Sequence, residues 1–148
     1  MAAAVAAIVK ARQDEPRSLK RSTAVPEIIV TSLSMRALAV ARRADPSIRI
    51  GLIVTASTGD LRRLDVDLLV VDSRLASSRF LARATAAGLP VTVWNVSDAD
   101  QFTQLALRGV SGVITPDVEP MRVRLIELGK LDGIERLLLA VRSRLLGR

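Results

Sequence analysis

The feature that most constrains the fold is a succession of short apolar segments, each followed by a segment with helix signals. These segments are rich in Val, Ile and Leu and lack the alternation of a half-exposed strand. They lie at residues 27–31, 48–54, 68–71, 91–96 and 110–115. Strands that are apolar throughout are typical of parallel sheets covered by helices on both faces. The strand–helix order therefore predicts an α/β fold with a parallel sheet.

Capping residues mark the helices between these strands. Ser34 is a good N-cap, and Asp45-Pro46 ends the helix that it begins. Gly88 stands where a left-handed C-cap is usual, and the Ser97-Asp98 pair starts another helix. We expect helices over 2–13, 34–45, 76–87, 98–109, 118–128 and 132–146, and only a short one within 59–64.

The chain divides into three parts on these signals. Residues 1–24 read as an N-terminal helix and a basic linker, residues 25–120 as strand–helix units, and residues 121–148 as C-terminal amphipathic helices. The last helix gathers its leucines on one broad face, with arginines largely outside it. We favour packing on the sheet or on a partner chain for this face, and binding to an anionic membrane surface is the alternative.

The absence of two residue types excludes several kinds of chemistry. The chain has no cysteine, which excludes a disulfide framework and a thiol nucleophile. It has no histidine, which excludes a Ser-His-Asp triad, a His-ligated metal and an imidazole acid or base. Any hydrolytic reaction that needs such groups must receive them from outside this sequence.

The net charge of +7 first suggests a nucleic-acid partner. The excess of basic residues lies toward the two ends, however, and residues 51–100 are nearly balanced. Only Phe80, Trp94 and Phe102 are aromatic, so no stacking platform for single strands exists. We therefore favour solvated helix faces and disfavour nucleic acid. No signal peptide or apolar run of roughly 20 residues stands out, so we expect a cytoplasmic chain, or membrane association within a longer anchored protein.

Two architectures fit a parallel sheet of this kind: an open doubly wound sheet and a (β/α) barrel. In both, functional groups gather at the carboxyl ends of the strands. Those ends here are small and polar, apart from one tryptophan, Trp94. No GxGxxG or Walker loop follows a strand, so the usual signature of nucleotide binding is missing.

One block of sequence carries a family signal. It reads Ala-Ala-Gly-Leu-Pro-Val-Thr-Val-Trp-Asn-Val-Ser-Asp over 86–98, then Leu-Ala-Leu-Arg-Gly-Val-Ser-Gly-Val-Ile-Thr over 105–115. This resembles the C-terminal end of the glycerophosphodiester phosphodiesterase family, which reads G-x-x-V-x-x-W-T-V-N, then a helix, then G-V-D-G-I-I-T-D. Upstream, Ile29-Val-Thr-Ser32 and Ile50-Gly-Leu52 are similar to further family segments, so the resemblance covers about residues 25–120.

This sequence departs from the family motifs more at the expected site positions than in the apolar residues of the strands and helices. The family's W-T-V-N is Trp-Asn-Val-Ser over 94–97, and the aspartate of G-V-D-G is Ser111. The final T-D is interrupted by Pro116, and Leu33 stands for the usual Phe. Each exchange is polar for polar or apolar for apolar, apart from the added proline.

The resemblance implies the C-terminal half, roughly strands five to eight, of a TIM-type barrel of the PLC-like phosphodiesterase kind. Such a barrel has about 250 residues, and this chain has 148. The family's first half holds a His-Arg-Gly motif, a Glu-x-Asp metal pair and a second catalytic histidine, none of which maps here. We therefore expect no catalytic residue and no metal ligand in this chain. A divalent cation, Mg²⁺ or Ca²⁺, is implied only for the complete fold.

The resemblance implies that Trp94 lines the substrate pocket and contacts the glycerol moiety, against the simpler interpretation of a core tryptophan. Ser32 and Thr115 also sit at predicted strand ends, where their hydroxyls could bind substrate or cap the next turn. Asp72 and Asp117 could pair as metal ligands, but helix N-capping is the favoured interpretation of both.

The function implied is hydrolysis of a glycerophosphodiester, with this half as the pocket wall and inactive alone. An open half-barrel exposes two strand edges, so we expect a partner: an N-terminal half-barrel or a second copy. Substrate would bind only in the completed barrel. The alternative is a non-enzymatic α/β binding or regulatory module.

Overall fold

The structure is a computed structural model that describes residues 28–56, 59–135, 138, 139 and 141. The predicted N-terminal helix and linker over 1–24 lie outside the described residues, as does most of the predicted helix over 132–146. Within the described residues, strands and helices alternate as expected. The elements are β1 (Ile29–Ser32), α2 (Met35–Ala44), β2 (Arg49–Val54), η1 (Leu61–Arg63), β3 (Leu68–Asp72), η2 (Ser73–Leu75), α3 (Ser78–Ala86), β4 (Val91–Trp94), α4 (Ala99–Leu107), β5 (Gly112–Val113) and α5 (Val118–Lys130), where η marks a 3₁₀ helix.

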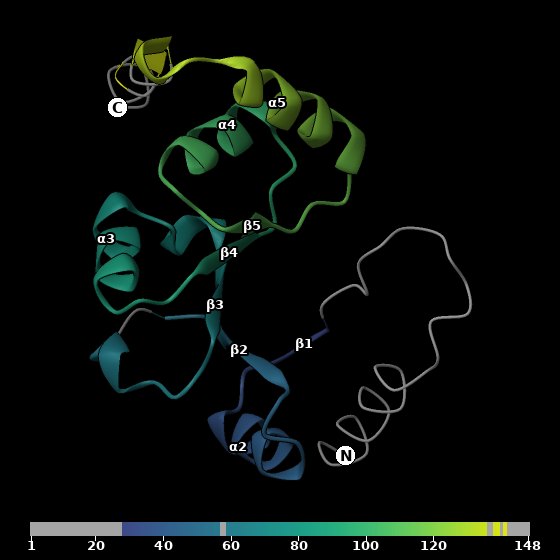
Figure 1. Cartoon of the computed structure of the whole chain (residues 1–148), viewed down its shortest axis with the longest axis vertical. Helices are drawn as coiled ribbons and strands as arrows, with labels where there is room; N and C mark the ends of the chain where they lie inside the picture. The colour runs from purple at the N-terminus through teal and green to yellow at the C-terminus, as the bar shows by residue number, and fades with distance from the viewer. Residues whose placement is uncertain (1–27, 57–58, 136–137, 140, 142–148) are drawn as a thin grey trace.

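The five described strands form one sheet in the order β1-β2-β3-β4-β5, and every neighbouring pair is parallel. Figure 1 shows the strands following one another along the middle of the molecule, with β1 and β5 at the two ends of the sheet. The predicted parallel α/β fold is confirmed. Sequential strand order with a helix or short turn at each crossover is the arrangement of a (β/α) barrel segment rather than a doubly wound sheet.

The predicted strands match the observed ones within a few residues, and the largest difference is at β5. The apolar run over 110–115 forms a regular ladder only at Gly112–Val113. Backbone hydrogen bonds continue on both sides, because Ser111 N donates to Val91 O and Ile114 N donates to Val93 O. Between these two hydrogen bonds, β5 advances by three residues while β4 advances by two. β5 therefore contains one extra residue, a β-bulge, which interrupts the ladder.

Capping side chains set the helix boundaries, as the sequence predicts. Ser34 caps α2 and its hydroxyl accepts from Ala37 N, and Asp98 caps α4 through Gln101 N. Gly88, at the end of α3, has φ of 71°, the left-handed conformation that glycine adopts without cost. The helix predicted from residue 76 begins at Ser78 instead, because Asp72 and Ser77 each cap a separate helix.

The core lies between one face of the sheet and the helices α2, α3 and α4. On this face of β3 and β4, Val71 and Val93 are fully buried, and they meet helix residues such as Leu38, Phe80 and Phe102. Side chains alternate along a strand, so the residues between them point to the opposite face. We call that opposite face the inner face. Gly51 lies on the inner face. A Cβ atom at this position would stand only 3.1 Å from side-chain atoms of Leu68 and Thr31.

A partly buried ion pair ties α2 to the amino ends of β2 and β3. Arg42 Nη2 lies 2.6 Å from Asp67 Oδ2, and Ile50 N donates to the same oxygen at 2.7 Å. Both side chains are 29% exposed. Hydrogen bonds to a charged group in such surroundings are stronger than those between neutral groups, so this contact fixes one helix against two strands.

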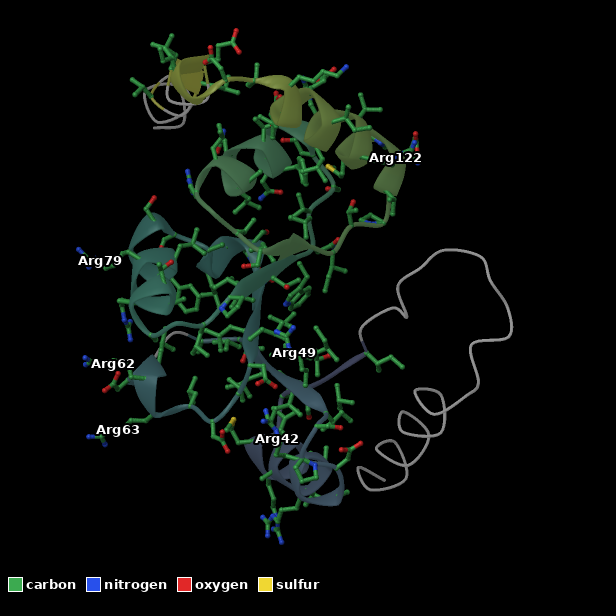
Figure 2. All side chains as sticks on the ribbon, viewed as in Figure 1. Arg42, Arg49, Arg62, Arg63, Arg79 and Arg122 are labelled. Atoms are coloured by element: carbon green, nitrogen blue, oxygen red, sulfur yellow. The ribbon has the colours of Figure 1, made fainter. Side chains whose placement is uncertain are left out.

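Exposed arginines line one flank of the described part of the molecule, and the choice between solvated faces and a nucleic-acid surface stays a prediction. Figure 2 shows Arg62, Arg63 and Arg79 pointing outward along one flank of the molecule, away from the sheet. Arg62 and Arg63 are 74% and 87% exposed. Among the helices of the described residues, none is long and apolar enough to cross a bilayer.

Candidate functional site

The strands end at one edge of the sheet because they are all parallel, and this carboxyl edge is the candidate site. Asp72 and Trp94 are the last residues of β3 and β4, and the register places them side by side. Val71 and Val93 face the helices, so Asp72 and Trp94 both face the inner side. The structure thus brings an indole and a carboxylate together at the edge where barrel enzymes bind their substrates.

Trp94 has a polar group that finds no partner among the described residues. Its indole Nε1 is buried and makes no hydrogen bond to any of them, although the residue as a whole is half-buried. A buried N–H of this kind usually finds an acceptor, and a tryptophan presents apolar area together with this one donor. The position therefore suits contact with a ligand that has both carbon and oxygen at its surface.

Asp72 is engaged by Arg74, two residues further on. Its carboxylate accepts from Arg74 Nε at 2.8 Å and from Arg74 Nη2 at 2.9 Å, and it also accepts from the Arg74 backbone N–H. These hydrogen bonds from Arg74, side chain first, lower the pKa of Asp72 from its ordinary 3.8 to about 2. Asp72 also caps η2, which confirms the favoured prediction of capping.

Asp117 precedes α5 at the N-cap position, but its side chain makes no capping hydrogen bond. The neighbouring hydroxyl of Thr115 holds this turn instead. Thr115 Oγ1 accepts from Asp117 N at 3.2 Å and donates to Asp117 O at 3.1 Å. A threonine that bonds the backbone two residues on is the local turn motif expected of this residue type.

Ser32 and Thr115 do not gather with Trp94. Ser32 follows Thr31, which shares the inner face with Gly51, so Ser32 lies on the helix-covered face. Its hydroxyl accepts from Ser34 N at 3.1 Å. Thr115 lines an apolar groove between β5 and α5. Substrate contact by Ser32 and Thr115 stays a prediction, as it does for Trp94.

Sequence reasoning did not single out Arg74 as part of this edge. The signal was present as an aspartate at the end of an apolar strand with an arginine two positions later. The face on which Asp72 lies depends on the pairing of β3 with β4, which a single sequence does not give.

The described residues contain no group of three or more acidic, histidine or cysteine side chains that could hold a metal ion. At the carboxyl edge, the carboxylate of Asp72 is already paired with a guanidinium. The donor set on this edge therefore does not fit a divalent cation, and no chemical step through one is derived from these residues.

Comparison with known families gives the chain its relatives. The model of the glycerophosphoryl diester phosphodiesterase family matches residues 2–119, which is most of the sequence. The chain belongs to this family. The suspected family resemblance is thereby confirmed, and with it the assignment of the strands and helices to a phosphodiesterase barrel. A search of curated proteins returns no match.

Two solved structures share the fold of this family member. A protein described as a glycerophosphoryl diester phosphodiesterase from Silicibacter pomeroyi DSS-3 is 23% identical, with a TM-score of 0.70 over 87% of this chain and 44% of that one. A phosphodiesterase from Oleispira antarctica, solved with the product sn-glycerol-3-phosphate, is 21% identical, with a TM-score of 0.67 over 82% of this chain and 48% of that one. This chain spans less than half the length of these TIM-barrel relatives, as the half-barrel interpretation predicts.

Proposed function

We propose that this chain supplies the glycerol-binding wall of a glycerophosphodiester phosphodiesterase barrel and does not hydrolyse substrate alone. The observation that carries the proposal is Trp94, which ends β4 on the inner face with its indole N–H buried and without an acceptor among the described residues. The family membership supports it, and so does the glycerol phosphate bound by the relative from Oleispira antarctica.

The chemistry of the proposed role follows from what the indole offers. Its ring gives apolar area against the carbon chain of glycerol. Nε1–H is closed to solvent in the free chain, and it can donate to one glycerol hydroxyl once the groups that cover it move aside. That hydrogen bond would give a partner to a donor that has none in the part of the chain that the structure describes. Leaving such a donor unpaired costs roughly 1–3 kcal/mol, so a ligand oxygen at this place is favoured.

The bond-breaking step needs groups that this sequence lacks. A water oxygen attacks phosphorus, the bond from phosphorus to the alcohol oxygen breaks, and the alcohol leaves with a proton. General bases and acids for such a step are commonly histidines, and the chain has none. We assign the acid, the base and any divalent cation to a complementary N-terminal half-barrel, so the glycerophosphodiester is a substrate only of the completed barrel.

The test is a hydrolysis assay of the purified full chain on glycerophosphocholine with Mg²⁺ or Ca²⁺. We expect no turnover, and the same background from a Trp94→Ala variant as a matched control. Turnover by the wild-type chain well above that of Trp94→Ala would overturn the claim that this half is inactive alone. Absence of both turnover and glycerol phosphate binding would favour the non-enzymatic binding module.

A further inference from the structure

Arg74 lies in η2, the short 3₁₀ helix that follows the carboxyl end of β3. Its guanidinium reaches back to Asp72, with Nε 2.8 Å from Oδ1 and Nη2 2.9 Å from Oδ2. Asp72 pairs in register with Trp94, and both residues face the inner side. Figure 1 shows their strands, β3 and β4, adjacent in the middle of the sheet. Arg74 therefore places a cation at the carboxyl edge, one strand away from the residue to which we assign the glycerol.

Asp72 uses only one edge of this guanidinium. A guanidinium has five N–H donors in a planar fork, and a pair of them can bind two oxygens of one anion. Asp72 takes the edge formed by Nε and Nη2. On the other edge, Nη1 makes no hydrogen bond to any described residue, and Nη2 keeps one of its two hydrogens. We call this edge, formed by Nη1 and Nη2, the outer edge of Arg74.

The two partners differ in exposure to solvent. The side chain of Arg74 is 87% exposed, whereas that of Asp72 is only 14% exposed. An anion that approaches from solvent therefore meets the guanidinium before it meets the carboxylate. Because Asp72 already holds the fork in place, the arginine loses little side-chain entropy when its outer edge binds a second anion.

A ligand that fits both Arg74 and Trp94 joins an oxyanion to a short carbon chain. The planar guanidinium matches two phosphate oxygens, and an indole offers apolar area with one donor. Neighbouring strands lie about 4.8 Å apart, so one small molecule can reach from β3 to β4. A glycerophosphodiester has this chemistry, because its phosphate carries a negative charge and is bonded directly to the glycerol.

We propose that Arg74 is a specificity-determining residue, which binds the phosphate group of the glycerophosphodiester through its outer edge while Trp94 contacts the glycerol. The inference rests on the proposed function, because it concerns the same edge of the sheet. Asp72 is a positioning residue here, since it acts through the guanidinium that it holds. Arg74 thereby favours an anionic ligand over an uncharged polyol and takes no part in breaking a bond.

Calorimetric titration of the full chain with sn-glycerol-3-phosphate tests the contact without relying on Trp94 emission. Arg74→Gln should raise the dissociation constant by about tenfold, which is typical of the loss of a hydrogen bond to a charged group. Arg79→Gln is the matched control. It removes the same charge from α3, where Figure 2 shows Arg79 pointing away from the sheet, and it should bind as wild type does.

A second pair of variants separates Arg74 from the carboxylate behind it. Removing Arg74 also leaves Asp72 unpaired, and that negative charge would itself repel a phosphate. In the Asp72→Asn background this repulsion is absent, so a further Arg74→Gln change should still weaken binding severalfold. Equal dissociation constants for Asp72→Asn and for the double variant would overturn the proposal, because the whole effect would then come from the carboxylate.

The outcomes distinguish this inference from the proposed function. If wild type binds glycerol phosphate and Arg74→Gln binds it equally well, the role of Arg74 is overturned and the glycerol-binding wall stands. If wild type does not bind glycerol phosphate, both are overturned.

The wild-type chain also provides a test that needs no substitution. Salt screens exposed charges, so the affinity for glycerol phosphate should fall between low and high salt. An affinity that salt leaves unchanged would contradict binding through an exposed guanidinium. Circular dichroism on each variant shows whether its helix content is retained.

Discussion

Asp72 and Arg74 show how one pair of side chains shapes the carboxyl edge. The guanidinium binds the carboxylate through two hydrogen bonds, and Asp72 pairs in register with Trp94 on the neighbouring strand. An arginine whose fork is held in this way has fewer conformations to lose when a further acceptor arrives. The pair therefore presents a fixed charge distribution at the edge where we place the glycerol moiety.

The lowered pKa of Asp72 predicts a dependence of stability on pH. The folded chain holds this carboxylate ionised down to about pH 2, whereas the unfolded chain protonates it near 3.8. The pair thus contributes stability above pH 3.8, and that contribution is lost as the pH falls toward 2. We expect Arg74→Gln to lose less stability than wild type between pH 4 and pH 2, measured by urea unfolding.

The exposed Arg79 provides the control for this experiment. It stands on α3, and Arg79→Gln removes the same charge without touching Asp72. Its unfolding curves should change with pH as those of wild type do. If the free energy of unfolding falls equally for wild type and Arg74→Gln between pH 4 and pH 2, the Asp72–Arg74 contact does not persist in solution.

At the scale of single residues, the sequence predicts position better than orientation. Trp94 was expected at a strand end and is there, because apolar β-branched runs mark strands whatever their neighbours. Ser32 was also expected at a strand end and ends β1, yet it lies on the helix-covered face. The face is set by the register between β1 and β2, which is a tertiary contact.

Among the elements, α2 is held against the sheet by core packing through Leu38 and by one partly buried ion pair near the amino ends of β2 and β3. Asp67→Asn removes the ion pair with Arg42 and leaves that guanidinium short of an acceptor. Another nitrogen of Arg42, Nε, is already buried with no partner among the residues that the structure describes. We expect a loss of about 1–3 kcal/mol in the free energy of unfolding, measured by urea denaturation at neutral pH.

A matched substitution at an exposed pair separates this effect from the loss of a charge. Asp60→Asn removes an aspartate that caps η1 and contacts Arg62 at 3.1 Å, both in exposed positions. Exposed ion pairs contribute little to stability. Equal losses for Asp60→Asn and Asp67→Asn would show that the ion pair at Asp67 has no special role in holding α2.

The boundaries of elements depend on neighbours that no local pattern records. The apolar run over 110–115 predicts a six-residue strand, yet the regular ladder covers Gly112–Val113 alone. The extra residue between Ser111 and Ile114 is visible only against β4. Caps, in contrast, are local, and for this reason Ser34, Asp98 and Gly88 were found where the sequence predicts them.

At the scale of the whole molecule, the five described strands have the order of a barrel segment and do not close on one another. The chain matches less than half the length of two barrel relatives, and both ends of the sheet are open within the described residues. This arrangement separates two tasks that one complete barrel performs together. In the function that we propose, this half recognises the substrate, while proton transfer needs groups that this sequence lacks.

Emission from the single tryptophan reports directly on whether the carboxyl edge binds a glycerol phosphate. The measurement is a fluorescence titration of the full chain with sn-glycerol-3-phosphate, with inorganic phosphate at equal concentrations as the control. We predict a saturable change in Trp94 emission with glycerol phosphate and none with phosphate, because the indole contacts the glycerol part. An emission spectrum that glycerol phosphate leaves unchanged would contradict the assignment of this edge as the glycerol-binding wall.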